Sequence, residues 1–237
     1  FPSGYQANLG LLSALGQMAG TIFSDALNHA SIIDGCRLSK CPIVVYPHGD
    51  MNALEKALKA NKSKRKIVVT DEIFSMDGDG APLDQMAALK ARYDFILVTD
   101  SAHSSGVFGP DGRGWARQCK AHDAVDFHVG TLSKAFAAQG GFVACGKNAY
   151  DWLINTARTF IFTTALPVPV AAGACAAIEV SVEEPHHREI LWARVQQVRK
   201  ALNQKVQGPI VPILVGTERA ALKLAKGLLD EGLHVPA

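Results

Sequence analysis

Three side chains that could do chemistry follow two apolar runs of this sequence. Asp100 and His103 come after the run 95–99, and Lys134 comes shortly after a second run, 127–130. In open α/β sheets, ligands bind beyond the carboxyl ends of the strands, so these side chains can face one pocket. A lysine desolvated among small residues becomes a nucleophile, because burial disfavours its ammonium form. An Asp that faces a ring nitrogen and a Lys that forms an imine are the pair that pyridoxal 5'-phosphate chemistry requires.

Other residues could complete such a site. A phosphate needs hydroxyls and free backbone N–H groups, which Thr131 and the Gly4-Tyr5 entrance to a predicted helix, 6–16, can provide. His29 stands among small residues and could lie flat on a pyridine ring. Each residue also has an ordinary explanation: a hydrogen-bonded core histidine for His29, and a helix cap with a surface histidine for the Asp100 segment.

The strands and helices that must position these residues alternate along the chain. Apolar or β-branched runs predict five strands, and their continuous apolarity indicates burial on both faces. The predicted strands are 43–46, 67–70, 95–99, 127–130 and 141–145, and the predicted helices between and after them are 51–60, 83–93 and 150–159. This alternation predicts an α/β fold with a mainly parallel sheet flanked by helices.

The pattern changes after Glu184. A long amphipathic helix is predicted over 188–204, followed by a strand over 210–215 and a second helix over 218–229. We therefore expect a large domain over 1–184 and part of a smaller C-terminal α/β domain over 185–237.

Composition excludes several classes of protein. The 237 residues are 48% hydrophobic and 19% charged with a net charge of +2, which suits a globular enzyme rather than a nucleic-acid-binding protein. The five cysteines lack the spacing of a metal site, so we expect no metal and reduced thiols. The uncharged stretch 159–178 is interrupted by Pro167 and Pro169, which favours a loop and a buried helix over a membrane span.

Seven stretches in order resemble the α-oxoamine synthases, which are pyridoxal-phosphate enzymes of fold-type I. They are FPSGYQAN, SDALNHASIIDG, VVTDEIFSMDGDGAPL, ILVTDSAHSSGVFG, GRG, VGTLSKAF and IFTTALPVP, and they extend over nearly the whole chain. Within the family, FSMDGDGAPL and NHASIIDG are most similar to the biotin-pathway branch in its plant-like form.

The resemblance implies a role for each matching residue. It implies that Lys134 forms the Schiff base with the cofactor and acts as the base, that Asp100 pairs with the ring nitrogen, and that His103 hydrogen-bonds the ring oxygen. It also implies that His29 stacks on the ring. The remaining implied contacts are Gly4, Tyr5 and Thr131 to the phosphate, Ser75 in the cofactor pocket, and Thr163 or Thr164 reaching the phosphate of a neighbouring subunit, since family members share sites across a homodimer interface.

The implied reaction is the decarboxylative condensation of L-alanine with pimeloyl-CoA, or a pimeloyl carrier protein, to 8-amino-7-oxononanoate. The sister activities of 2-amino-3-ketobutyrate CoA ligase, 5-aminolevulinate synthase and serine palmitoyltransferase are alternatives, because the branches share the site. A truncated or regulatory subunit without catalysis is an alternative of another class.

Both ends of the chain depart from the family pattern. The family carries an N-terminal section and a C-terminal continuation with a carboxylate-binding arginine, so we expect this chain to be an excerpt. The stretch 205–210 also looks shorter than its family counterpart. The chain opens without a recognisable targeting segment, and we expect a cytoplasmic protein unless such a segment, for example one directing it to an organelle, lies outside these residues.

Overall fold

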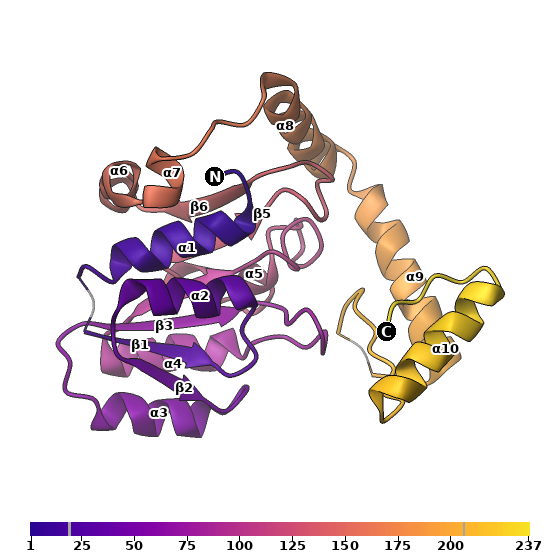
Figure 1. Ribbon diagram of the computed structural model, residues 1–237, viewed down its shortest axis with the longest axis horizontal. Coiled ribbons are helices and arrows are strands. Elements are labelled where there is room, and N and C mark those ends of the chain that lie inside the picture. Colours follow the sequence, from indigo (N-terminus) through magenta and orange to yellow (C-terminus); the bar gives the residue numbers. More distant parts are fainter. Residues whose placement is uncertain (19, 206) are drawn as a thin grey trace.

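The core of the molecule is a six-stranded sheet with helices on both faces (Figure 1). The computed structural model describes residues 1–18, 20–205 and 207–237. The strands are β1 (Thr21–Asp25), β2 (Ile43–Tyr46), β3 (Lys66–Asp71), β4 (Ile96–Asp100), β5 (Phe127–Thr131) and β6 (Gly141–Cys145). They lie in the order β2-β1-β3-β4-β5-β6, and every neighbouring pair is parallel except β5–β6, which is antiparallel. The predicted α/β fold with a mainly parallel sheet is thus confirmed.

Each face of the sheet is covered by its own helices and its own hydrophobic cluster. The helices are α1 (Gly4–Leu15), α2 (Ala30–Ser39), α3 (Met51–Ala60), α4 (Leu83–Tyr93), α5 (Trp115–Gln118), η1 (His122–Ala124), α6 (Lys147–Thr156), α7 (Arg158–Ile161), α8 (Val168–Glu183), α9 (His186–Leu202) and α10 (Glu218–Asp230). One cluster joins α1 and α2 to Ile22, Val69 and Val98 of the sheet. The other joins α3 and α4 to Phe23 and Val68, because successive side chains of a strand point to opposite faces.

Two predictions about strands were wrong. The predicted strand 210–215 is irregular, since no strand within the described residues pairs with it. Burial on both faces holds for β3 and β4 but fails for β2, where Val45 is 62% exposed, because β2 lies at the edge of the sheet. Strand β1, in contrast, was missed by the sequence analysis although it is buried along its whole length.

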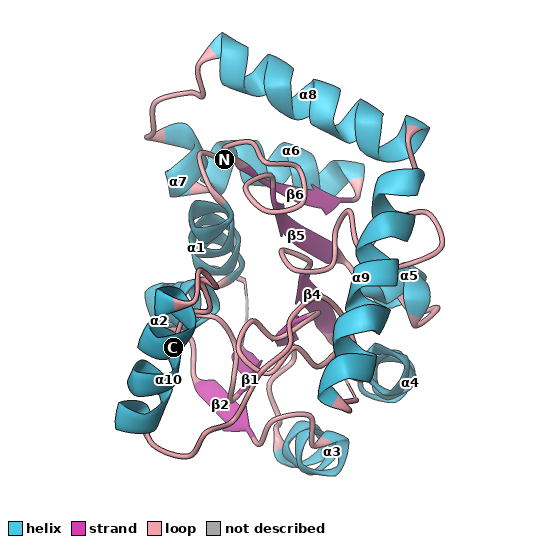
Figure 2. Ribbon diagram, turned by 90° about the vertical axis from the view of Figure 1, so that its right-hand side faces the viewer, coloured by secondary structure: helices cyan, strands magenta, loops and turns pink. Residues whose placement is uncertain are grey.

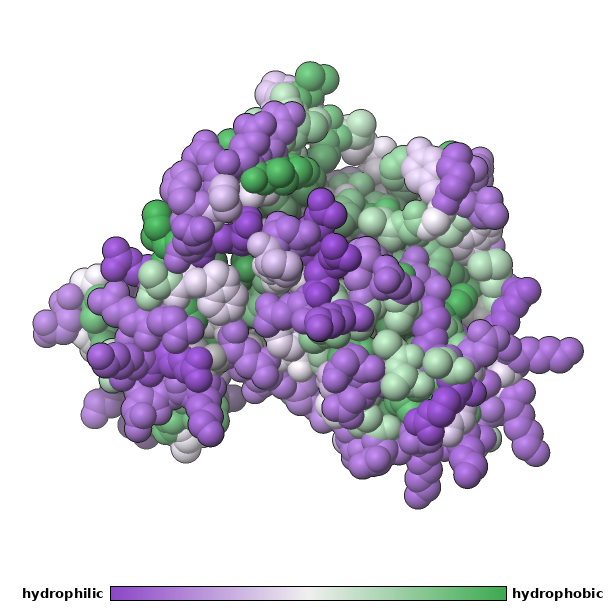
Figure 3. Space-filling model, turned by 180° about the vertical axis from the view of Figure 1, so that it is seen from behind, coloured by the Kyte–Doolittle hydropathy of each residue, from purple (hydrophilic) through white to green (hydrophobic). Residues whose placement is uncertain are grey.

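The last helices extend beyond the sheet. Figure 2 shows α8 across the top and α9 running down from it, in front of the strands. Helix α8 buries Ala174 but exposes apolar side chains, including Val168 and Val182, and hydrophobic residues gather on the surface at the top of the molecule (Figure 3). The expected helix within 159–178 is therefore present, but it is exposed rather than buried. No helix in the described parts of the chain is both long enough and apolar enough to cross a membrane.

Candidate active site

The carboxyl edge of the sheet brings two of the predicted residues to one cavity. Strand β4 ends at Asp100 and β5 ends at Thr131, and these two strands, which follow each other in the chain, are also neighbours in the sheet. His103 follows β4, Lys134 lies in the loop between β5 and β6, and both line a cavity of about 470 Å³. Most of the other lining side chains are apolar and come from this edge, from α8 and α9, and from Pro209 and Ile210.

Asp100 is a buried carboxylate held by neutral donors. The Asn8 side chain donates to Asp100 Oδ2 at 2.6 Å, and the backbone N–H of Ala102 donates to Oδ1 at 2.8 Å. Burial raises the pKa of Asp100 above its ordinary value, although these hydrogen bonds and the charge of Lys134 oppose the shift. A cationic N–H group at this carboxylate would offset its desolvation.

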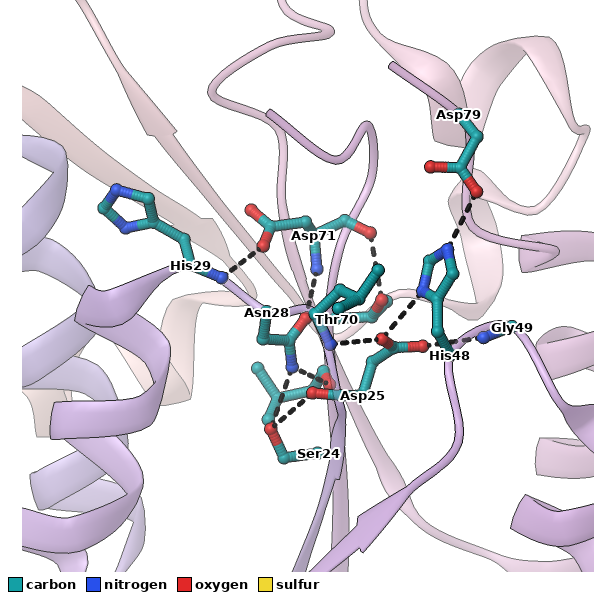
Figure 4. Close-up of polar contacts among 11 residues, drawn as sticks. Ser24, Asp25, Asn28, His29, His48, Gly49, Thr70, Asp71 and Asp79 are labelled. Carbon is teal, nitrogen blue, oxygen red and sulfur yellow. Dashed lines mark hydrogen bonds and ion pairs between the residues drawn. The ribbon is translucent and has the colours of Figure 1, made fainter. Parts of the chain in front are cut away.

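His29 is fixed at the start of α2 next to a second buried carboxylate (Figure 4). Its backbone N–H donates to Asp71 Oδ2 at 2.7 Å, and Asn28 accepts the backbone N–H of Asp71 at 2.9 Å. Burial, and then the neighbouring Asp100, raise the pKa of Asp71 well above its ordinary value. Asp71 therefore takes up a proton at a higher pH than an exposed carboxyl group does.

The environments of His103 and Lys134 differ from each other. Burial and the nearby Lys134 charge lower the pKa of His103 to about 4, so that its imidazole is neutral at physiological pH. Lys134 itself is exposed. The prediction of a desolvated lysine was wrong, because Lys134 lies in the loop between β5 and β6, which is open to the cavity.

The start of α1 forms a close-packed cradle against the end of β5. A Cβ atom on Gly4 would lie 3.0 Å from Thr131 Cβ, so only a glycine lets the two segments approach this closely. The Thr131 hydroxyl donates to Gly140 O at 3.1 Å and also contacts Ser133 Oγ at 2.8 Å. Tyr5 is partly exposed, and its hydroxyl donates to Asp34.

Of the ten predicted residues, only His103 and Lys134 line the cavity of about 470 Å³, and the other eight are not part of its lining. Three of these eight lie at other hollows or on a connection. Ser75 is exposed in the loop after β3 and lines a different cavity, of about 570 Å³, with residues of the C-terminal segment. Thr163 lines a small hollow of about 250 Å³ beside α7, and Thr164 is exposed on the connection to α8.

A histidine bridge connects the loops next to this edge (Figure 4). His48 contacts Asp25 Oδ1 through Nδ1 at 2.9 Å and Asp79 Oδ2 through Nε2 at 2.8 Å. Its ring also packs edge-on against Phe74, with the ring centroids 4.4 Å apart. The bridge ties the end of β1 to the loop that carries Ser75.

The sequence analysis missed three polar residues that support this site. Asn8 and Ser31 lie beside Asp100 and His29, and Glu72 is a fully buried carboxylate that accepts from Thr99, Ser104 and the backbone N–H of Trp115. Asn8 did carry a signal, since it is a polar residue one helical turn after Gly4 on the face of the helix whose other buried residues are apolar. Glu72 carried a weaker signal, a second acid directly after Asp71.

Comparisons with known proteins agree on one family. The family model described as "Aminotransferase class I and II" matches residues 1–237. An 8-amino-7-oxononanoate synthase of Anaeromyxobacter dehalogenans is 44% identical over 243 residues, covering 100% of this chain and 61% of the relative. One of Arabidopsis thaliana is 42% identical over 254 residues, covering 100% of this chain and 53% of the relative.

Solved structures share the fold. A serine palmitoyltransferase described as the internal aldimine with PLP has a TM-score of 0.91 at 34% identity, covering 99% of this chain and 61% of that one. An 8-amino-7-oxononanoate synthase of Francisella tularensis has a TM-score of 0.82 at 28% identity, covering 98% of this chain and 70% of that one. The chain therefore spans between half and two thirds of the length of the curated relatives named above.

Proposed function

Because the chain belongs to the aminotransferase class I and II family, we propose that it binds pyridoxal 5'-phosphate at the carboxyl edge of its sheet. The observation that carries the proposal is that buried Asp100 ends β4, while Lys134 lies at an open cavity in the loop after the adjacent strand β5. This is the pair of groups that the cofactor's ring nitrogen and aldehyde require.

The residues present fit this cofactor. Asp100 is desolvated and accepts hydrogen bonds from neutral donors, so a protonated ring nitrogen would offset the cost of its burial. The cradle of Gly4 and Thr131 places a hydroxyl beside the N-terminus of α1, where the helix dipole favours a phosphate. When bound, the cofactor supplies an electron-accepting ring for the carbanion that forms at Cα of an amino acid.

Four residues of the chain would have separate roles toward the cofactor and the amino acid. Lys134 Nζ would hold the cofactor covalently and would also be the base that moves the proton at Cα of the amino acid. Neutral His103 would donate its N–H to the ring oxygen, and Asp100 would keep the ring nitrogen protonated. His29 would limit the movement of the ring.

We take the reaction to be the decarboxylative condensation of L-alanine with pimeloyl-CoA, or with a pimeloyl carrier protein, to 8-amino-7-oxononanoate in biotin synthesis, in which carbon dioxide and the thiol of CoA or of the carrier are released. The names of the relatives support this branch, and the largely apolar lining of the Lys134 cavity suits an acyl chain. The similarity to serine palmitoyltransferase structures keeps a sister activity as the second candidate.

A homodimer with a shared active site is part of the proposal. The exposed apolar side chains of α8 are typical of an interface. Thr163 and Thr164 lie outside the Lys134 cavity of their own chain, which fits a role toward a neighbouring subunit.

The test begins with cofactor capture. The purified chain is incubated with pyridoxal 5'-phosphate, reduced with borohydride, digested and analysed by mass spectrometry. We expect the phosphopyridoxyl group on Lys134, with none on the peptide in the Lys134→Ala variant and unchanged labelling in Lys147→Ala, an exposed control on α6. Labelling spread evenly over surface lysines would contradict a specific site.

Substrate choice is tested separately. L-alanine with pimeloyl-CoA is compared with glycine and acetyl-CoA, glycine and succinyl-CoA, and L-serine and palmitoyl-CoA, with the condensation products measured by mass spectrometry. Product from the first pair alone supports the biotin branch, and product from another pair assigns the sister activity. Labelling of Lys134 without any product would favour the non-catalytic alternative.

A further inference from the structure

Asn8 lies at the junction of three elements that surround the proposed site. It belongs to α1, its side chain is buried, and its Nδ2 donates to Asp100 Oδ2 at the end of β4 at 2.6 Å. The same nitrogen donates to Ser31 Oγ in α2 at 2.9 Å. One amide group thus connects the carboxylate Asp100 to the helix that His29 begins.

The charge of Asp100 fixes which way the Asn8 amide points. An ionised carboxylate can only accept hydrogen bonds, so Asn8 must turn its NH₂ group toward Asp100. In this orientation Asn8 Oδ1 is buried without a hydrogen-bond partner among the described residues. A buried carbonyl without a partner is costly, yet the flipped amide would place that oxygen against the carboxylate, which is worse.

The direction of the hydrogen bonds continues from Asn8 to His29. Because Ser31 Oγ accepts from Asn8, its own proton is free to go to His29 Nδ1, which lies 2.8 Å away. The backbone N–H of Ser31 also donates to His29 Nδ1, at 3.2 Å. A ring nitrogen that accepts from both donors carries no proton, so the proton of the neutral imidazole lies on Nε2.

We propose that Asn8 is a positioning residue that links Asp100 to His29: the charge of Asp100 turns the Asn8 NH₂ group inward, Asn8 then donates to Ser31 rather than accepting from it, and the Ser31 proton is left for His29 Nδ1, which favours the Nε2-protonated tautomer. The coupling acts in both directions. It holds His29 in one orientation at the start of α2, and it supplies Asp100 with a donor that favours its charged form.

The electrostatics of Asp100 agree with this role. Burial raises the pKa of Asp100, and the Asn8 hydrogen bond is the largest contribution that opposes the shift. Loss of this donor would let Asp100 take up a proton at a higher pH, which removes the charge that a ring nitrogen needs. The part of the proposal that concerns the cofactor rests on the proposed function, whereas the tautomer of His29 does not.

Asn8→Asp and Asn8→Leu separate the two effects. The first replaces the donor with an acceptor of nearly the same shape, so the Ser31 hydroxyl turns to the new carboxylate and His29 Nδ1 loses that donor. The second removes the hydrogen bonds to Asp100 and Ser31 but leaves the Ser31 proton free for His29. Asn52→Asp, on the exposed surface of α3, is the matched control.

The first readout is the ¹⁵N NMR spectrum of the imidazole of His29 in the cofactor-free chain. We expect the Nε2-protonated tautomer in the wild type, Asn8→Leu and Asn52→Asp, and a mixture of tautomers in Asn8→Asp. A wild-type His29 protonated on Nδ1, or a tautomer unchanged in Asn8→Asp, would overturn the relay. The tautomer of His29 is measured without the cofactor, so a failure of the relay is distinguishable from a failure of the proposed function.

The second readout is the dissociation constant of pyridoxal 5'-phosphate against pH, measured by equilibrium dialysis. We expect weakening of about tenfold in Asn8→Leu and about 100-fold in Asn8→Asp, with the acidic loss of affinity moved to higher pH in both. Affinities within twofold of Asn52→Asp at every pH would contradict a role for Asn8 at Asp100. Should Asn8→Asp fail to fold, Ser31→Ala removes the relay alone, and a His29 tautomer unchanged in that variant would overturn the proposal.

Discussion

Asp71 and Asp100 are direct partners in the register of β3 and β4, so two buried carboxyl groups end side by side at one edge of the sheet. Burial raises the pKa of both groups. Asp100 accepts hydrogen bonds from Asn8 and from the backbone N–H of Ala102, whereas Asp71 accepts from the backbone N–H of His29. The two carboxyl groups therefore have different hydrogen-bond partners.

We predict that Asp71→Asn and Asp100→Asn differ sharply in cofactor affinity. In Asp71→Asn the carbonyl oxygen of the new amide can still accept the backbone N–H of His29, so affinity should stay within about threefold. Asp100→Asn removes the charge and should weaken binding roughly 100-fold. Fluorescence titration with pyridoxal 5'-phosphate measures both, with Asp151→Asn on the surface of α6 as the control. Equal losses in the two variants would contradict the assignment.

Gly141→Ala should damage the cradle at the start of α1. A Cβ atom at this position would lie 2.4 Å from Ser3 C and 2.5 Å from Gly4 N, so the helix entrance must move. We expect a loss of about 1–3 kcal/mol of stability from overpacking, together with weaker binding of the cofactor phosphate. Gly146→Ala is the matched control, because nothing lies within 4 Å of its Cβ. Urea unfolding and cofactor titration of both variants are the measurements.

Glu72→Gln should destabilise the chain most strongly at neutral pH. Burial opposes the charged form of Glu72, but contacts with His128, Ser104 and Thr99 outweigh it and hold its pKa below the ordinary value. Such a group stabilises the fold above its unfolded pKa, near 4.3, and the contribution disappears as the pH falls through the lower folded pKa. We expect a loss of about 2–4 kcal/mol at neutral pH.

Urea unfolding of Glu72→Gln across the acidic range is the measurement, and Glu189→Gln on the surface of α9 is its control. The difference in the free energy of unfolding between wild type and variant should become smaller toward acidic pH. If this difference stays constant with pH, Glu72 stabilises the fold through its shape rather than its charge.

The His48 bridge predicts a pH dependence of the opposite sign. Partial burial lowers the pKa of His48, but Asp25 and Asp79 outweigh it, so the folded pKa is raised. The stabilisation is then complete below about pH 6.5 and is lost as the pH rises through the folded value. Glutamine does not titrate, so we expect the stability of His48→Gln to change less than that of the wild type between about pH 6 and 8. His186→Gln, an exposed change on α9, should keep the wild-type profile; thermal unfolding at several pH values tests both.

The sequence predicted the centre of the sheet and missed parts of its surroundings for identifiable reasons. Strands β3, β4 and β5 are mainly apolar runs, which is why these strands, and a common pocket for Asp100 and Lys134, could be predicted. Strand β1 was missed because Thr21, Ser24 and Asp25 interrupt the apolar pattern, although the sheet buries all three. The local sequence pattern does not show which neighbouring strands will bury these polar residues.

The supporting residues of the site depend on contacts between distant segments. Asn8 meets Asp100 across 92 positions of the chain, and Asn28 meets Val69 O across 41. Spacing along the sequence cannot reveal such pairs, because they exist only once the sheet order is set. The exposure of Lys134 likewise follows from the loop between β5 and β6 rather than from its small neighbours.

The sheet order also governs when the chain can acquire its cofactor during biosynthesis. The proposed contacts begin at Gly4 and end at Lys134, and β5, which leads to that lysine, is held in place by β6 on one side and β4 on the other. A nascent chain that has exposed only the residues up to Asp100 can pair β1 with β2 and β3 but has no Lys134 to offer. The cofactor could therefore be held covalently only after the residues through Lys134 have been made, so it could not be a template for the pairing of β1, β2 and β3.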